Sequence, residues 1–435
     1  MEPQAHYPAP LMATHLIDRF LGSAIRKGTL EVVHPEGGIS RFGEPAPDMP
    51  DVRIRFTDSS VARKIMLDPR LGAAEAFMDG RLVIERGDVM DLARLFRANA
   101  RWERTGSLKP ASRWKGLRNR LVTAIDGVNR AARAKANVAH HYDIGNDFYR
   151  LFLDADHMQY SCAYWPQGEQ GPDMTLEQAQ EAKLAHIAAK LALVPNDGPP
   201  TQSVLDIGCG WGGMAIYLAR HHAVRVTGIT LSQEQLALAR TRAEAAGVAD
   251  RVRFELVDYR DLAARGQRFD RIVSVGMFEH VGQAQFGQFF RAAGTMLADD
   301  GVMLLHTIGR LGRPGATDAF TRKYIFPGGY IPALSETLAA SEKCRLIATD
   351  VETLRIHYAL TLREWYRRTV AHQAEIEAMY DARFYRMWCF YLAGAATVFE
   401  DGGMCNYQIQ YTRDRRALPL TRGYMAEAEA RLLAT

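Results

Sequence analysis

Cysteine is scarce in this chain: only five of its 435 residues are cysteines, widely spaced and without a Cys-x-x-Cys pair. An odd, scattered set supplies neither a disulfide framework nor zinc-ligand spacing, so we expect reduced thiols and no metal site. Long apolar runs are also absent, because the longest apolar stretch without a charge, 387–399, has 13 residues, whereas a bilayer-spanning helix needs about 20. The N-terminal residues show no basic region followed by an apolar one, which argues against a secretory signal. These absences predict a cytoplasmic protein.

Positive charge is concentrated in one segment. Residues 101–135 contain ten Lys or Arg and two acids, although the whole chain has a net charge of only +4. A basic segment in a nearly neutral protein indicates an anionic surface, either a membrane or a nucleic acid, or else a solvated helix face. Nucleic acid is the least expected partner, since the basic residues lack interleaved aromatics or a recognisable RNA module.

The pattern of apolar residues divides the chain into three parts. Residues 1–100 are expected to form a small α+β domain, followed by a basic helical connector, 101–136. From 137 to 435, short apolar strands alternate with helices, which is typical of a doubly wound α/β sheet. The expected strands are 203–208, 225–230, 251–258, 269–276, 302–309, 345–354 and 405–412, and the expected helices are 175–193, 214–222, 232–246, 284–297, 361–380 and 382–399. Capping boxes are expected at Thr175/Gln178 and at Ser232/Gln235.

A glycine motif follows the first strand of the third part. The segment VLDIGCGWGG, 204–213, contains a GxGxxG pattern between an expected strand and an expected helix, where glycines let the backbone turn against a nucleotide. The second strand ends in Thr230 without the carboxylate that a dinucleotide ribose requires, and no phosphate-binding Lys-Ser/Thr follows the loop. S-adenosylmethionine (SAM), a nucleoside derivative that carries no phosphate, suits these residues. We expect Asp206 to orient its amino-acid part and Asp258 to meet the adenine amine.

Eight motifs then follow one another along the chain. They are HYDIGNDFYRLFLD (141–154), MQYSCAYW (158–165), VLDIGCGWGG (204–213), GITLSQEQ (228–235), FDRIVSVGMFEHVG (269–282), LLHTIG (304–309), KYIFPGGYIP (323–332) and HYALTLREWYRR (357–368). From residue 137 to the C-terminus the chain therefore resembles the cyclopropane-fatty-acyl-phospholipid synthases, which are similar to the mycolic-acid cyclopropane synthases. The resemblance implies a class I SAM-dependent methyltransferase domain, and the N-terminal part resembles the auxiliary domain of longer bacterial members. In this family SAM supplies a methylene carbon to a cis double bond of an unsaturated phospholipid acyl chain, and bicarbonate accepts the proton.

The resemblance implies two groups of site residues. The cofactor group is Tyr160, Ser161, Asp206, Gly208, Cys209, Gly210, Trp211, Thr230, Leu231, Ser232, Gln235, Asp258 and Tyr259. The bicarbonate group is Cys162, Glu279, His306, Ile308 and Tyr358, of which Cys162, Glu279, His306 and Tyr358 are implied to be catalytic. A thiol, a phenol, an imidazole and backbone amides can all donate to a small oxyanion. Glu279 can take part only by orienting His306 or by taking the bicarbonate proton.

Methyl transfer to an alkene creates a carbocation, so the site needs a dry pocket with aromatic walls. The candidate aromatic residues are Tyr142, Phe148, Tyr149, Tyr160, Tyr164, Trp165 and Phe278. The double bond lies inside the bilayer, and exposing about nine methylenes to water would cost roughly 7 kcal/mol at ~0.8 kcal/mol each. We therefore expect peripheral docking on the inner face of the membrane through the basic segment, where each Lys or Arg contributes about 1 kcal/mol.

Some alternatives stay open. The same carbocation leads to a methyl-branched or methylene product as readily as to a cyclopropane. An amine or small-molecule methyltransferase shares the scaffold, and a silent lipid-binding protein is a further reading because Ala395 stands where the family often carries a cysteine. Alkene methylation needs no covalent enzyme intermediate, so we expect activity to survive with Ala395. The resemblance also implies a homodimer.

Overall fold

The computed structural model describes residues 9–104, 145–168, 174–195 and 198–434. The chain divides into two compact units, each built from separate stretches of sequence. The first unit takes 1–109, 318–325 and 362–403, and the second takes 110–317, 326–361 and 404–435. Most of the expected basic connector, 101–136, lies outside the described residues. The three-part division of the chain stays a prediction.

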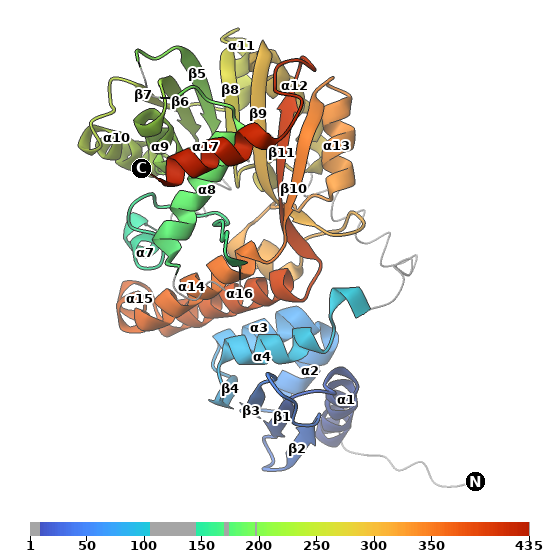
Figure 1. Cartoon of the computed structure of the whole chain (residues 1–435). Coiled ribbons are helices and arrows are strands. Elements are labelled where there is room, and N and C mark those ends of the chain that lie inside the picture. Colours follow the sequence, from blue (N-terminus) through green and yellow to red (C-terminus); the bar gives the residue numbers. More distant parts are fainter. Residues whose placement is uncertain (1–8, 105–144, 169–173, 196–197, 435) are drawn as a thin grey trace. The chain divides into compact units, whose positions relative to one another are not determined.

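The first unit contains a four-stranded sheet in the order β2-β1-β3-β4 (Figure 1). β1 (Thr29–Val33) lies parallel to β3 (Asp51–Phe56), while β2 (Ile39–Phe42) and β4 (Leu82–Arg86) are antiparallel to their neighbours. β3 forms because its alternating sequence, DVRIRF, buries every second side chain. The helices are α1 (Ala9–Ala24), α2 (Ser60–Leu67), α3 (Pro69–Met78), α4 (Val89–Ala98), most of α14 (His357–Ala371), α15 (Gln373–Met379) and α16 (Ala382–Glu400), with short turns η1 (Trp102–Arg104) and η5 (Thr321–Ile325). α16 packs against α3 and α4.

The second unit is a seven-stranded doubly wound sheet in the order β10-β11-β9-β8-β5-β6-β7. Its strands are β5 (Gln202–Ile207), β6 (Val224–Thr230), β7 (Val252–Leu256), β8 (Phe269–Val275), β9 (Leu297–Arg310), β10 (Ile347–Leu354) and β11 (Met404–Thr412). β11 is antiparallel to both of its neighbours, β9 and β10. The remaining pairs, β5–β6, β5–β8, β6–β7 and β8–β9, are parallel. The carboxyl ends of the parallel strands therefore share one edge, where sheets of this kind bind ligands.

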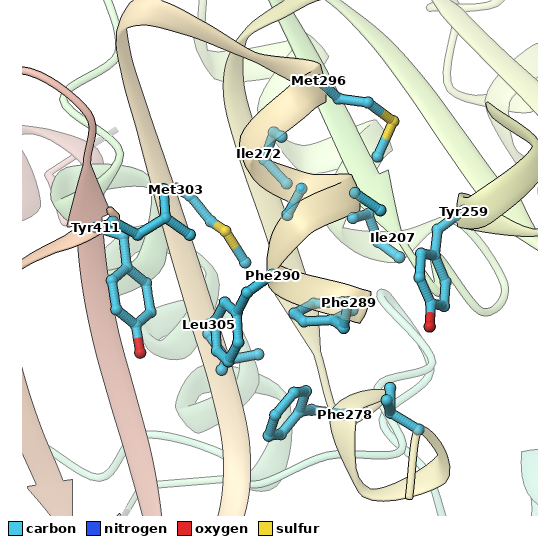
Figure 2. Packing of buried hydrophobic residues seen from close by; sticks show 14 of the residues in the cluster. Ile207, Tyr259, Ile272, Phe278, Phe289, Phe290, Met296, Met303, Leu305 and Tyr411 are labelled. Carbon is cyan, nitrogen blue, oxygen red and sulfur yellow. The ribbon is translucent and has the colours of Figure 1, made fainter. Parts of the chain in front are cut away.

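Helices cover both faces of this sheet (Figure 1). One face packs against α8 (Leu176–Lys190), α9 (Gly213–His221), α10 (Gln233–Ala245) and α17 (Gly423–Leu433), and the other against α11 (Tyr259–Ala264), α12 (Phe286–Met296) and α13 (Leu334–Glu342). The remaining short elements are α7 (Asn146–Arg150), η3 (Phe278–His280) and η4 (Gln283–Gln285). Figure 2 shows the hydrophobic core between the sheet and α11, α12 and α13, in which Phe278, Phe289 and Phe290 lie beside Leu305 and Met303. No helix among the described residues is long and apolar enough to cross a bilayer.

The structure confirms all seven strands and most helices expected between 175 and 412, with shifts of a few residues at their ends. The predicted helix 361–380 is in fact two, because α14 ends before His372 and α15 begins after it. The capping box at Thr175 and Gln178 is present. The capping box predicted at Ser232 and Gln235 forms only in part. The Ser232 hydroxyl accepts the backbone N–H of Gln235 as predicted. The Gln235 side chain, however, accepts from the Thr230 hydroxyl at 2.9 Å and not from the Ser232 backbone, so this half of the prediction is wrong.

Candidate active site

The glycine motif forms the turn between β5 and α9. Gly208 and Gly210 have φ values of +84° and +53°, which favour glycine. A Cβ atom on Gly208 would lie 2.8 Å from the side chain of Met277, whereas one on Gly210 would meet no atom within 4 Å. Gly213 lets another segment approach, since its Cβ would lie 2.1 Å from the carbonyl oxygen of His157. The motif therefore serves packing at Gly208 and Gly213 and leaves open space at Gly210.

A pocket opens at this turn and receives almost every residue predicted for the cofactor. Its lining includes Tyr160, Ser161, Asp206, Gly208, Cys209, Gly210, Trp211, Thr230, Leu231, Gln235, Asp258 and Tyr259. Ser232 is the exception, and it caps α10 instead. Sequence reasoning missed Gln159, Arg260, Met277 and His280, which also line the pocket. Each of these four lies within two residues of a predicted site residue, so the motifs were found but their edges were drawn too narrowly.

Asp206 is a buried carboxylate aimed at this pocket. Burial raises its pKa to about 7, an effect that the positive charge of Lys183 partly offsets. Its Oδ2 atom is buried and makes no hydrogen bond among the described residues. A buried acid with an unused oxygen is stabilised by a cationic ligand group, such as the ammonium of an amino-acid moiety.

Lys183 ties the pocket wall to α8. Its ammonium group donates to Gln159 Oε1 and, at 3.2 Å, to Ser161 Oγ. Complete burial lowers its pKa to about 8. Lys183 thus positions two lining residues, and its positive charge favours the ionised form of Asp206.

Two further groups suit a nucleoside. Both Asp258 oxygens are held by Arg260, at 2.7 Å from its Nε and 2.6 Å from its Nη2, and Oδ1 also accepts the Arg260 amide at 2.9 Å. An ionised carboxylate has about four acceptor positions, so room is left for one further donor such as an adenine amine. Thr230, the last residue of β6, donates its hydroxyl to Gln235 Oε1 in α10. This bond leaves the Gln235 side-chain nitrogen at the pocket wall.

Glu279 lies in η3, directly after β8. Its Oε1 atom accepts the backbone N–H of Ile308, and its Oε2 atom is buried without a hydrogen bond among the described residues. Burial raises the pKa of Glu279 to about 7, although the hydrogen bond from the Ile308 amide opposes the shift. The Ile308 amide is therefore engaged by Glu279, and donation of that amide to an anion, which the resemblance implies, would require Glu279 to release it.

His306 lies on β9 two residues before Ile308, on the same face of the strand. Its Nδ1 atom lies 3.2 Å from the Gln408 amide nitrogen and its Nε2 atom 3.4 Å from the Asn406 amide nitrogen. Burial, with the positive charges of Lys183 and Lys190, lowers its pKa well below the usual value. His306 is therefore neutral at physiological pH. The structure records no hydrogen bond from Glu279 to His306, so Glu279 does not orient the imidazole as one reading of the sequence expected.

The segment that follows Cys162 is bonded to the first turn of α14, which carries Tyr358. The Ala163 amide donates to Thr361 Oγ1 at 3.1 Å, and the Trp165 amide donates to His357 Nδ1 at 2.9 Å. These bonds hold the segment after Cys162 against the first turn of α14. Cys162 is fully buried, and this burial raises the pKa of its thiol. That these two side chains and Glu279, His306 and Ile308 converge on one anion stays a prediction.

The aromatic candidates separate into different environments. Tyr160 lines the pocket and touches Tyr149, whose ring centroid lies 5.3 Å away. Phe278 packs in the core of Figure 2, 4.3 Å from Phe286, and does not line the pocket. Tyr164 is stacked against a histidine ring, that of His186, at 4.1 Å. The other candidates are Phe148, Tyr149 and Trp165, which are buried, and Tyr142, which lies outside the described residues.

Comparison with known proteins places the chain in a family. The model of the family described as "Mycolic acid cyclopropane synthetase" matches residues 129–409. The chain belongs to this family. It is 36% identical over 375 residues to the cyclopropane-fatty-acyl-phospholipid synthase of Escherichia coli, covering 86% of this chain and 91% of that protein. It is 42% identical over 295 residues to a Pseudomonas putida protein named "Probable fatty acid methyltransferase", covering 66% of this chain and 72% of that protein.

Solved structures of the mycolic acid cyclopropane synthetase family share the fold. The mycolic acid cyclopropane synthase CmaA1, complexed with SAH and CTAB, matches with a TM-score of 0.58 and 33% identity over 64% of this chain and 97% of that chain. The second unit is thus a class I SAM-dependent methyltransferase domain, and the chain is a SAM-dependent C-methyltransferase. The unused oxygen of Asp206, the open space at Gly210 and the Gln235 amide suit SAM.

Proposed function

We propose that this enzyme is a cyclopropane-fatty-acyl-phospholipid synthase that uses SAM and bicarbonate. The observation that carries the proposal is the pair of buried groups at the ends of β8 and β9. One carboxyl oxygen of Glu279 makes no hydrogen bond among the described residues. His306 is neutral and has an amide side chain at each of its ring nitrogens. Neither side chain lines the cofactor pocket, so a second, anion-handling task explains them better than the cofactor does.

Bound SAM would supply an electrophilic methyl group to the alkene. Asp206 would hold the cationic amino-acid part of the cofactor, Thr230 and Gln235 the ribose, and Asp258 the adenine amine. On the lipid, the new C–C bond leaves a carbocation, and loss of one proton from the added carbon closes the ring. Glu279 and His306, with Cys162 and Tyr358, would hold bicarbonate where that proton is released, and the Ile308 amide would join them only if Glu279 released it.

A pKa of about 7 suits Glu279 to this task. In its protonated form the carboxyl group can donate to an anion through Oε2 while Oε1 still accepts the Ile308 amide. In its ionised form it can take up a proton from that anion. General acid–base groups work best when their pKa lies near the operating pH.

The proposed substrate is an unsaturated phospholipid, reached from the membrane surface. We infer peripheral association with the inner face of the membrane, cytoplasmic location and a homodimer. The basic segment 101–135 would provide the electrostatic attraction to anionic lipid.

The decisive experiment combines purified protein, SAM carrying a CD₃ group and vesicles of unsaturated phospholipid. We expect the acyl chains to gain one methylene that keeps two of the three deuterons, with a high-field ring signal in the deuterium NMR spectrum. A product carrying an intact CD₃ group, or an olefinic methylene signal, would replace the cyclopropane assignment. Absence of label in the lipid, with transfer to an amine instead, would reject the lipid substrate.

One observation favours a second candidate. The relative with 42% identity is named as a fatty acid methyltransferase rather than a cyclopropane synthase. A methyl-branched or methylene product requires the same carbocation and a different final step. The isotope pattern and NMR spectrum described above separate these outcomes.

A further inference from the structure

One face of β11 is polar and yet buried. Asn406, Gln408 and Gln410 have at most 1% of their surface exposed, and they alternate with apolar residues that pack into the core of Figure 2. A strand with this alternation usually turns its polar face to water. Here that face lies against α8, which brings the buried Lys190 to it. Buried amides need specific partners, so their orientation is fixed by what they contact.

Lys190 determines how Gln408 is oriented. The ammonium group forms an ion pair with Glu352 and donates to Gln408 Oε1 at 2.9 Å. An ammonium group has donors only, so Gln408 must turn its carbonyl oxygen toward Lys190. Its NH₂ group consequently faces His306 Nδ1 at 3.2 Å.

This arrangement determines where His306 carries its proton. A neutral imidazole has one N–H group and one acceptor nitrogen. Because Gln408 offers an N–H donor, Nδ1 must be the acceptor and Nε2 must carry the hydrogen. The oxygen and nitrogen of an amide are distinguished by their partners, so Asn406, 3.4 Å from Nε2, turns its oxygen to that hydrogen.

Turning the amide in this way places the Asn406 NH₂ group where Oδ1 was. That position is buried, and no group among the described residues donates a hydrogen bond to an oxygen there. Asn406 pairs with Ile308 across the β11–β9 ladder, and the Ile308 amide is bound to Glu279. The unsatisfied end of Asn406 therefore lies at the strand level where the proposed anion would be held.

We propose that Lys190 is a positioning residue that acts through Gln408 to fix His306 as the Nε2–H tautomer, so that His306 holds the Asn406 oxygen and the Asn406 NH₂ group is left as a donor at the strand level of Ile308, whose amide Glu279 binds. The inference rests on the proposed function for its chemical purpose. The tautomer itself is a property of the protein without ligand. It can therefore be measured independently of any product.

The test uses full-length protein labelled with ¹⁵N-histidine, in which protonated and unprotonated ring nitrogens have separate shifts. The His306 signals are assigned among the 13 histidines by their loss in a His306→Gln variant. We expect an unprotonated Nδ1 and a protonated Nε2. In Gln408→Glu, a carboxylate faces both Lys190 and His306, so the proton should move to Nδ1.

Two further variants make the result specific. Lys190→Met removes the cation that orients Gln408, and the His306 pattern should change to a mixture or to the opposite tautomer. Gln410→Glu is the matched control: it makes the same substitution two residues along β11, where the side chain contacts the Lys190 carbonyl and Tyr424, and it should leave His306 unchanged. SAM affinity, measured by calorimetry, should stay within about two-fold in Gln408→Glu, because Gln408 does not line the cofactor pocket. Turnover should fall at least about ten-fold, since a histidine in the wrong tautomer presents its proton on the wrong side.

The outcomes separate the two proposals. A wild-type His306 protonated at Nδ1, or a His306 pattern unchanged in both Gln408→Glu and Lys190→Met, overturns the positioning role even if the enzyme makes cyclopropane lipids. If Lys190→Met does not fold, Gln408→Glu decides alone, because it keeps the ion pair and the side-chain volume. If the tautomer changes as expected but no lipid product forms in the wild type, the orientation by Lys190 stands and the proposed function fails.

Discussion

Replacing Glu279 by Gln separates its chemical role from its structural one. A glutamine keeps the oxygen that accepts the Ile308 amide and places an NH₂ group at the position of Oε2. We expect SAM affinity to change by less than about two-fold and turnover to fall by about 10²–10⁴-fold, the usual contribution of a general acid–base group. Calorimetric titration with SAM and the vesicle assay measure the two quantities.

The same substitution should change stability in a pH-dependent way. Burial raises the pKa of Glu279 from 4.5 to about 7. The folded state therefore holds a proton that the unfolded state has lost, and wild-type stability falls as pH rises through the window from 4.5 to about 7. At about 1.4 kcal/mol per pKa unit, the full penalty above that window is about 3 kcal/mol.

Glu279→Gln carries no such penalty. Its unfolding free energy should match the wild type near the lower end of the window and exceed it by up to about 3 kcal/mol near pH 8. Urea unfolding at both pH values measures the difference, with Glu255→Gln as the control, because Glu255 pairs with Arg253 and Arg265 near the surface. Turnover within two-fold of wild type would refute the catalytic reasoning, and a pH-independent stability difference would refute the burial argument.

Two more predictions follow from other parts of the chain. Gly208→Ala should lose about 2–4 kcal/mol of stability, because it combines a positive φ with overlap on Met277, whereas Gly266→Ala, at φ +72° with open space around it, should lose about 1 kcal/mol; equal losses would contradict the packing role of Gly208. Binding to anionic vesicles should weaken between about 50 and 300 mM salt if residues 101–135 dock the protein, and sedimentation that does not depend on salt would remove that role.

Much of the methyltransferase fold could be predicted from local sequence. β5, β6, β8 and β9 are short apolar runs that alternate with helical spacing, and parallel sheets buried on both faces produce this pattern. The glycine motif, Asp206 and Asp258 were found for the same reason, because each lies at the end of a strand that could be recognised. Tyr160 and Ser161 follow no strand and were implied only by the resemblance to the family. Arg260 and His280 were missed since nothing local distinguishes a polar side chain that lines a pocket from one on the surface.

The polar interior of the sheet could not be predicted in this way. Alternating polar residues in β11 have the same period whether they face water or a buried lysine. The partner of Gln408 is Lys190, which is 218 positions away in sequence. Similarly, Gln235 has the spacing of a capping residue, and only the position of Thr230 at the end of β6 diverts its side chain. Contacts between distant residues decide these cases.

The discontinuous first unit has a consequence for synthesis. Its sheet and α1 to α4 leave the ribosome early, but α16, which packs against α3 and α4, is made roughly 300 residues later. At about 5–20 residues per second, this interval lasts roughly 15–60 s. During that time the surface that α16 will cover is exposed on the nascent chain, so a chaperone that shields apolar surface should raise the yield of this enzyme most when translation is slowed between the two parts.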